Sequence, residues 1–255
     1  MNYILLCLLS VLLFGLTGCF SLTGGGDSGL PAGCGKIDNA ESGPVCGESR
    51  EDSVHPDSRN WAPLFDYALS NADFERGVWY IDERGRLTAA EDQPIWTERE
   101  YGNFVLDLEY SCAPGANSGV LIYATDTENW IPATVEIQIQ DDLDPHWAEV
   151  PDTWRNGGLF GHCAPKVFNV RPAGEWNRMT ITAAGRNITV AVNGEITVEA
   201  DLSDWKDAEK NPDGSEIPSW LSTPWAELPV RGKIGLQGRH GNATIYFRNV
   251  RIKEL

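Results

Sequence analysis

Basic residues are scarce in this sequence. Lysine and arginine together number 20, against 37 aspartate and glutamate residues, so the formal net charge is −17. Binding to nucleic acid or to anionic lipid through a basic face needs clustered Lys and Arg side chains, and this composition argues against both. The charge fits a soluble domain with a neutral or cationic ligand, and no nucleic-acid partner is expected.

Long apolar runs are also absent. The run at residues 4–16, about 13 residues, is too short to cross a hydrocarbon core of roughly 30 Å, but it suits the apolar region of a signal peptide. Residues 16–19 (LTGC) then resemble the bacterial lipobox, although residues 1–3 lack the usual Lys or Arg. We expect a signal peptide over 1–18, a lipid on Cys19, and a cell-envelope lipoprotein anchored in the membrane that faces the periplasm or the exterior. An ordinary cleaved signal peptide is the alternative.

The six cysteines include no C-x-x-C pair, which disfavours a zinc or redox motif. One cysteine leaves with the expected signal peptide and one would carry the lipid. The other four are Cys34, Cys46, Cys112 and Cys163. An even number in an oxidising compartment suggests two disulfides, and three pairings are open. Cys34–Cys46 and Cys112–Cys163 are favoured, with four free thiols as the alternative.

Apolar periodicity is missing from residues 19–60, where Gly, Ser, Pro, Asp and Glu dominate. Such a composition cannot bury enough surface to offset the entropy of ordering, so a flexible tether is predicted. From residue 61 to 255 the pattern changes to short alternating segments separated by turn residues, which is typical of a sandwich or barrel.

Helical periodicity is weak throughout this second region, and strands are expected instead. They are predicted at residues 104–110, 120–123, 134–140, 179–183, 187–192, 195–199, 233–237 and 244–253. Asn193-Gly194 is a strong hairpin signal. Residues 200–228 form a long irregular insertion, of a kind that is usually functional or disordered. The fold class is therefore all-β, a sandwich of two antiparallel sheets.

Seven short motifs in order carry a family resemblance. They are residues 117–122 (NSGVLI), 136–139 (EIQI), 158–161 (GLFG) with 164–165, 174–177 (GEWN), 193–194 (NG), 235–237 (GLQ) with 240–241, and 247–253 (FRNVRIK). Together they resemble the 3-keto-disaccharide hydrolase domain family over about residues 61–255. The resemblance implies a concanavalin A-like jelly roll that acts on 3-keto-glycosides. Tyr123 stands where family members often carry Arg, on a strand presumed to face the sugar.

The strand at 134–140 offers one polar face. Side chains alternate along a strand, so Glu136, Gln138 and Gln140 share a face, while Ile137 and Ile139 point to the core. Amides and a carboxylate suit sugar hydroxyls, although a solvated outer face is the simpler alternative. Only one carboxylate lies in this row, whereas a retaining glycosidase needs two about 5–5.5 Å apart. Ordinary double displacement is therefore not expected.

A 3-keto-glycoside can be cleaved differently, because the ketone acidifies the proton on C2. One base, a donor or cation at the enolate oxygen, and an acid for the leaving group would suffice. Glu136 and His162 are the predicted catalytic residues. The predicted substrate-binding residues are Gln138, Tyr123, Gln140, Trp130, Trp154 and His240. His240 has a turn role as an equal alternative, and a glycoside is the expected partner.

No metal motif is present, but Asp141, Asp142 and Asp144 cluster after this strand. Asp141 and Asp142 are candidate ligands for a divalent cation, the one cofactor left open, with a solvated acidic turn as the alternative. Two functions remain: elimination and hydration of 3-keto-glycosides, or carbohydrate binding without catalysis. A cell-surface adhesion domain is a third alternative.

Overall fold

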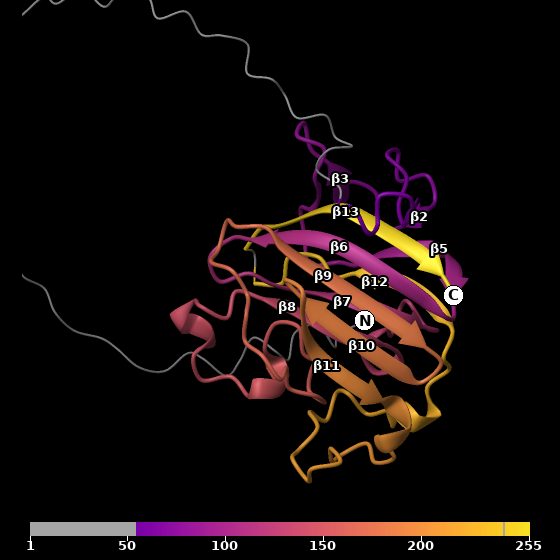
Figure 1. Cartoon of the computed structure of the whole chain (residues 1–255), viewed down its shortest axis with the longest axis vertical. Coiled ribbons are helices and arrows are strands. Elements are labelled where there is room, and N and C mark those ends of the chain that lie inside the picture. The colour runs from indigo at the N-terminus through magenta and orange to yellow at the C-terminus, as the bar shows by residue number, and fades with distance from the viewer. Residues whose placement is uncertain (1–54, 242) are drawn as a thin grey trace, which may run out of the picture. The chain divides into compact units, whose positions relative to one another are not determined.

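The computed structural model describes residues 55–241 and 243–255, which form two antiparallel sheets (Figure 1). The first sheet has eight strands in the order β11-β10-β9-β6-β13-β4-β3, with β1 paired to β13. Its strands are β1 (Ala62–Pro63), β3 (Trp79–Ile81), β4 (Leu87–Ala89), β6 (Phe104–Cys112), β9 (Asn177–Ala184), β10 (Asn187–Val192), β11 (Glu195–Asp201) and β13 (Ile245–Glu254). The predicted all-β sandwich is confirmed.

The second sheet has five strands in the order β2-β5-β12-β7-β8. They are β2 (Ala72–Asp73), β5 (Ile95–Tyr101), β7 (Asn117–Ala124), β8 (Val135–Gln140) and β12 (Gly232–Leu236). Short 3-10 helices lie in the connections: η1 (Ile131–Ala133), η2 (Pro145–Trp147), η3 (Asp152–Trp154), η4 (Leu202–Asp204) and η5 (Trp225–Glu227). This smaller sheet carries the candidate site.

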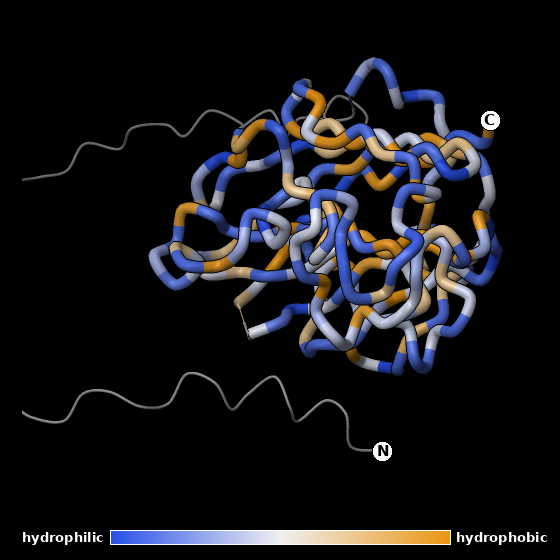
Figure 2. Tube along the Cα trace, turned by 90° about the horizontal axis from the view of Figure 1, so that it is seen from below, coloured by the Kyte–Doolittle hydropathy of each residue, from blue (hydrophilic) through white to orange (hydrophobic). Residues whose placement is uncertain are grey.

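The core follows from the alternation of apolar and polar residues, which Figure 2 shows along the chain trace. On β6, Phe104, Leu106 and Leu108 are fully buried. On β8, Ile137 and Ile139 are fully buried from the other sheet, as the pattern predicted. Burial of such side chains contributes about 1.5–3 kcal/mol each, so the period-two pattern decides which face of each strand turns inward.

The β10–β11 hairpin turns where the sequence predicted. Val192 lies opposite Glu195, and the two residues between them, Asn193 and Gly194, have φ values of 51° and 87°. Both angles fall in the left-handed region, which Asn and Gly tolerate better than other residues.

The insertion at 200–228 is ordered around two short helices. Ala226 N–H donates to the carbonyl of Trp205 at 2.9 Å, which joins η5 to the end of η4. Asn211, 4% exposed, accepts from the Trp205 indole at 2.8 Å and donates to the carbonyl of Gly161 at 3.2 Å. The insertion is thus fastened to the loop that follows β8.

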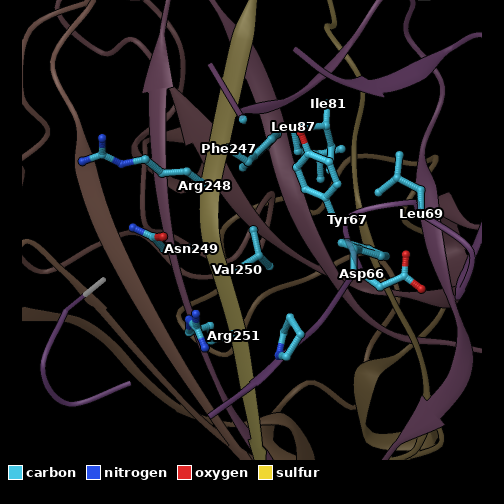
Figure 3. A pocket seen from close by; sticks show the side chains of 13 residues that line it. Asp66, Tyr67, Leu69, Ile81, Leu87, Phe247, Arg248, Asn249, Val250 and Arg251 are labelled. Carbon is cyan, nitrogen blue, oxygen red and sulfur yellow. The ribbon is translucent and has the colours of Figure 1, made fainter. Parts of the chain in front are cut away.

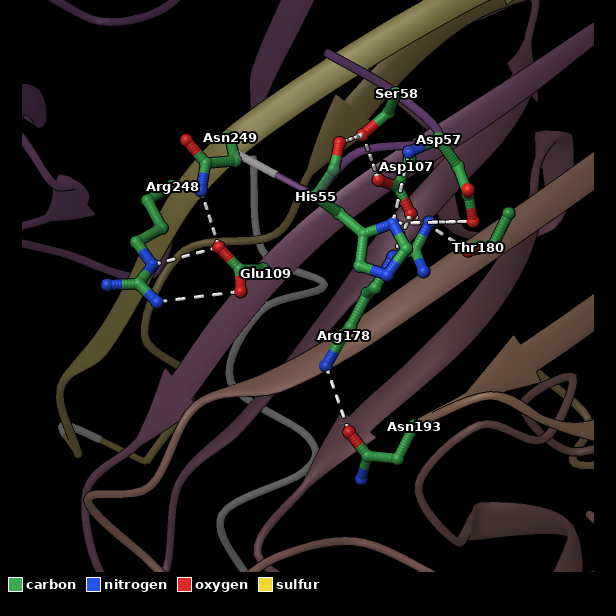
Figure 4. Close-up of polar contacts among 10 residues, drawn as sticks. All are labelled: His55, Asp57, Ser58, Asp107, Glu109, Arg178, Thr180, Asn193, Arg248 and Asn249. Carbon is green, nitrogen blue, oxygen red and sulfur yellow. Dashed lines mark hydrogen bonds and ion pairs between the residues drawn. The ribbon is translucent and has the colours of Figure 1, made fainter. Parts of the chain in front are cut away.

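The sequence predicted that the folded domain begins at Trp61, but in the structure it begins earlier. Ser58 is fully buried, and its hydroxyl donates to Asp107 on the eight-stranded sheet (Figure 4). Arg178 lies 2.8 Å from Asp107 and 3.6 Å from Asp57. Residues 55–60 therefore pack on the outer face of this sheet and are not part of a free tether.

The predicted Cys112–Cys163 disulfide is wrong, because both cysteines are free. Cys112 ends β6 and lies opposite Ile245 in the eight-stranded sheet, whereas Cys163 pairs with Leu159 beside the other sheet. Cys34, Cys46, Cys19 and the signal peptide lie outside the described residues. Within residues 55–241 and 243–255, no helix is long and apolar enough to cross a membrane.

Candidate functional site

The outer face of the five-stranded sheet carries an ordered set of side chains. One row across this face consists of residues that lie opposite one another on neighbouring strands: Trp96 of β5, Gly235 of β12, Leu121 of β7 and Glu136 of β8. In the next row Gln138 lies opposite Gly119, whose carbonyl accepts from the backbone N–H of Gln237 at 2.9 Å. In the third row Gln140 lies opposite Asn117, which also pairs with His240.

Two glycines make room for this site. A Cβ on Gly119 would overlap the carboxyl group of Glu136, so the Glu136 side chain lies directly over the backbone of β7. A Cβ on Gly235 would overlap the indole ring of Trp96 in the same way. The missing side chains allow a carboxyl group and an indole to lie flat on the sheet.

The surroundings of Glu136 favour the protonated form of its carboxyl group. Burial raises the pKa of its carboxyl group to about 8, an effect that the nearby His240 opposes and Asp92 reinforces. Asp92 accepts from or shares a proton with Nδ1 of His240 at 2.7 Å, and this contact raises the pKa of His240. A carboxyl group and an imidazole thus interact electrostatically, and the pKa of each is raised above its usual value.

The neighbouring amides form a short hydrogen-bonded chain. Gln138, 1% exposed, donates to Asn117 Oδ1 at 3.0 Å, and Gln140 donates to Asp142 at 3.0 Å. The Oε1 atoms of Gln138 and Gln237 are buried without a hydrogen-bond partner. A buried polar atom without a partner costs free energy, so these two acceptors are suited to ligand hydroxyl groups.

Tyr123 does not face this site, contrary to the prediction. The register between β7 and β12 shifts between Lys233 and Gly235, so β7 holds an extra residue there. Tyr123 takes a φ of 61°, and both Ile122 and Tyr123 turn into the core. Its ring is fully buried against Phe104, and its hydroxyl donates to the carbonyl of Gly185 at 2.8 Å. The β-bulge therefore removes Tyr123 from substrate contact.

His162 is a packing residue rather than a catalytic one. Its ring stacks on Trp225 at 3.6 Å between centroids and lies beside Trp205. Nδ1 lies 2.9 Å from the carbonyl of Phe160, and burial lowers the pKa of His162 to about 4. The charged groups that act on Glu136 are His240 and Asp92, so the structure replaces His162 by His240 as the histidine of the site.

The two predicted sugar-stacking tryptophans lie on either side of Glu136. Trp130 packs on Trp96, Leu121 and Ala124, on the face that carries Glu136. Trp154 ends η3 and lies 5.0 Å from the ring of Phe160.

Asp141 and Asp142 make contacts that fit a structural role. Asp141 accepts from the backbone N–H of Gly115 at 3.0 Å, and Asp142 accepts from that of Asn156 at 3.1 Å. Burial raises the pKa of Asp142 to about 6. In the part of the chain that the structure describes, no group of three or more His, Cys, Asp or Glu side chains could hold a metal ion.

The sequence motifs include Asn117 and Gln237 but gave them no role in the site, and no motif includes Asp92. The pairing of the 117–122 motif with the 134–140 strand, had it been assumed, would have placed Asn117 opposite Gln140. Asp92 lies 148 residues from its partner His240, and no local pattern links the two.

Other polar and hollow regions lie on the eight-stranded sheet. A cavity of about 350 Å³ is bounded by strands β3, β4 and β13 and by the segment near Asp66 (Figure 3). On the outer face of β6, Glu109 accepts from Arg248 at 2.9 Å and also from Asn249 (Figure 4). The Arg248 guanidinium in turn covers the ring of Trp176 at 4.0 Å. These charges are paired with one another, so they indicate a structural network.

The site can therefore perform proton transfer on a polyhydroxylated ligand. Glu136 can take or give a proton, His240 can do the reverse, and the amides of β7 and β8 can orient hydroxyl and carbonyl oxygens. Asp92 is committed to His240, so a second free carboxylate for double displacement is not found in the three rows.

Comparison with known proteins finds similarity to proteins that act on carbohydrates. The model of the 3-keto-alpha-glucoside-1,2-lyase-like domain matches residues 53–253. A presumed glycosyl hydrolase from Parabacteroides distasonis ATCC 8503 is 47% identical in sequence, with a TM-score of 0.74, over 76% of this chain and 99% of that one. A second presumed glycosyl hydrolase from the same organism is 22% identical, with a TM-score of 0.60, over 73% and 89% of the two chains, and shows the shared fold. No match was found among curated proteins.

Proposed function

Because this chain belongs to the family of 3-keto-alpha-glucoside-1,2-lyase-like domains, as its motifs predicted, we propose that it cleaves 3-keto-glycosides by elimination followed by hydration. The main observation that supports this proposal is the electrostatic interaction of Glu136 with the His240–Asp92 pair, on a sheet face lined with amide side chains. The 47% identical relative, described as a presumed glycosyl hydrolase, supports a role for this chain in acting on carbohydrates.

The first step is removal of the C2 proton. The C3 ketone acidifies this proton, and the carboxylate of Glu136 accepts it while negative charge moves to the ketone oxygen. Asn117 lies on the same sheet face and accepts from Gln138 through Oδ1, so its Nδ2 N–H groups can be directed at that oxygen. Hydrogen bonds to a developing oxyanion stabilise the transition state more than the ground state.

The second step is loss of the group on C1. Electrons return from the enolate to form the C1–C2 double bond, the C1–O bond breaks, and protonated His240 gives its proton to the leaving oxygen. Asp92 holds Nδ1 of His240, which leaves Nε2 as the donor nitrogen. Water then adds to C1 and gives its remaining proton to His240, while Glu136, whose proton has exchanged with solvent, protonates C2. These steps yield the free 3-keto-sugar and restore both residues.

Product analysis tests this proposal directly. Purified protein is incubated with 3-keto-glycosides of both anomers, and the products are identified by mass spectrometry and NMR. We expect an unsaturated 3-keto-sugar intermediate and then the hydrated 3-keto-sugar. When the reaction runs in water enriched in deuterium, the hydrated product should carry deuterium at C2. Binding of glycans that have no ketone, without turnover of any 3-keto-glycoside, would favour the binding-module alternative.

We also propose that the chain is held at the cell envelope by a lipid on Cys19, as residues 16–19 suggest. Cys19→Ser is expected to move the protein from the membrane fraction to the soluble fraction with its catalytic rate unchanged, since the proposed catalytic residues all lie between residues 92 and 240. Fractionation followed by immunoblotting measures this, with Cys7→Ser as the matched control. A Cys19→Ser protein that stays in the membrane fraction would contradict the anchor.

A further inference from the structure

Three aromatic side chains gather at the edge of the five-stranded sheet. The rings of Trp154 and Phe160 lie 5.0 Å apart, and those of Trp154 and Trp220 lie 6.2 Å apart. Trp220 is 45% exposed, and Trp154 and Phe160 are partly buried. Exposing an indole to water costs free energy that a bound ring could recover.

This cluster is in register with Glu136. Residues 157–160 extend the sheet beyond β8, because Leu159 pairs with Ile137 and the backbone N–H of Phe160 donates to the carbonyl of Glu136 at 2.9 Å. Leu159 is fully buried in the core. Side chains alternate along this segment, so Phe160 points to the face that carries Glu136.

The insertion at 200–228 holds the third ring in place. Leu221, the residue after Trp220, is buried against Gly161, where a Cβ would overlap its methyl group. Asn211 donates to the carbonyl of the same Gly161 at 3.2 Å. The insertion thus brings Trp220 to the cluster through contacts with the residue that follows Phe160.

Glu136 lies between this aromatic surface and strand β7. Its carboxyl group leans over Gly119 of β7, while Phe160 lies on the opposite side of β8 from β7. A ketone-bearing ring needs donors and acceptors around it, which the amides supply. The leaving ring needs only to be bound, and the apolar face of a pyranose suits indole and phenyl rings.

We propose that Trp154, Phe160 and Trp220 form the subsite for the leaving sugar ring of a 3-keto-disaccharide. This inference rests on the proposed function, because it assigns the leaving ring to one side of Glu136 and the 3-keto ring to the other. The base then lies beside C2, next to the bond at C1 that joins the two rings.

The test compares Trp220→Ala with the unaltered protein on two substrates, a 3-keto-disaccharide of two glucose rings and methyl 3-keto-glucoside. We expect kcat/KM for the disaccharide to fall roughly tenfold, mainly through KM, with less than a twofold change for the methyl glycoside. Trp220→Phe should restore most of the loss, because it keeps an aromatic ring. Tyr80→Ala, which removes an exposed aromatic side chain from β3, is the matched control and should change neither substrate.

Equal losses on both substrates, or no loss on either, would overturn the subsite. If the unaltered protein cleaves neither substrate, the proposed function fails and the subsite is decided by calorimetric binding of the same two compounds. Trp220→Ala should then weaken binding of the disaccharide alone, and equal binding by the two proteins would refute the inference.

Discussion

Glu136→Gln is expected to lower kcat for a 3-keto-glycoside by about 10²–10⁴-fold, the usual contribution of a general acid or base. The amide keeps the size and hydrogen-bonding capacity of the side chain but cannot accept the C2 proton. Exchange of the C2 proton with deuterium from solvent should fall by a similar factor, because it reports the same step without cleavage. Steady-state kinetics and NMR measure the two rates.

The pH dependence of the unaltered protein supplies a second readout for this assignment. Since the pKa of Glu136 is about 8, its carboxylate forms as pH rises, and kcat/KM should increase up to about pH 8. Deprotonation of His240, whose pKa is raised by its contact with Asp92, removes the acid and gives a falling limb. These apparent values belong to the coupled pair rather than to either residue.

Glu98→Gln is the matched control, because Glu98 is an exposed carboxylate on β5 of the same sheet. It should leave kcat and C2 exchange unchanged. Glu136→Gln should not weaken the fold. The raised pKa of Glu136 means that its contribution to stability is present below pH 4.5 and is lost as pH rises through about 8, and the amide avoids that loss. Full activity in Glu136→Gln would remove Glu136 from the mechanism.

Asp107→Ala is expected to destabilise the domain by about 3 kcal/mol, within the range found when one partner of a buried ion pair is removed. Asp107 is 2% exposed and accepts from Arg178 and Thr180, each at 2.8 Å, and from Ser58. The substitution leaves the Arg178 guanidinium without its buried partner and detaches the segment at residues 55–60. Chemical denaturation measures the change in the free energy of unfolding.

Asp204→Ala is the control for this prediction, since Asp204 lies in the first turn of η4, away from this network. Its effect should stay within about 0.5 kcal/mol, as for most surface substitutions. A chain that begins at Trp61 should lose part of the same stability, because it lacks Ser58 and Asp57. Equal stability of Asp107→Ala and the unaltered protein would show that residues 55–60 do not contribute to the fold.

Local chemistry in the sequence determined the strands from β6 onward and their faces, whereas β1 to β5 were not predicted. Alternation along β6 and β8 predicted which side chains are buried, because a strand repeats every two residues whatever it pairs with. The same alternation placed Glu136, Gln138 and Gln140 together on one face, and Asn193-Gly194 specified its turn through the backbone angles that these residues tolerate. The seven motifs, taken in order, predicted the family to which the chain belongs.

Pairing between distant segments was decided only by the tertiary structure. His240 meets Asp92 across 148 residues, and Phe160 becomes the neighbour of Glu136 only because its loop returns alongside β8. Tyr123 turned inward because one extra residue in β7 reversed the alternation, and a bulge of this kind depends on the partner strand as well as on its own residues. His162 found its place in the ring stack with Trp225 for the same reason, since the insertion that supplies Trp225 lies far along the chain. Periodicity is a property of one strand, whereas the site is a property of how strands and loops meet.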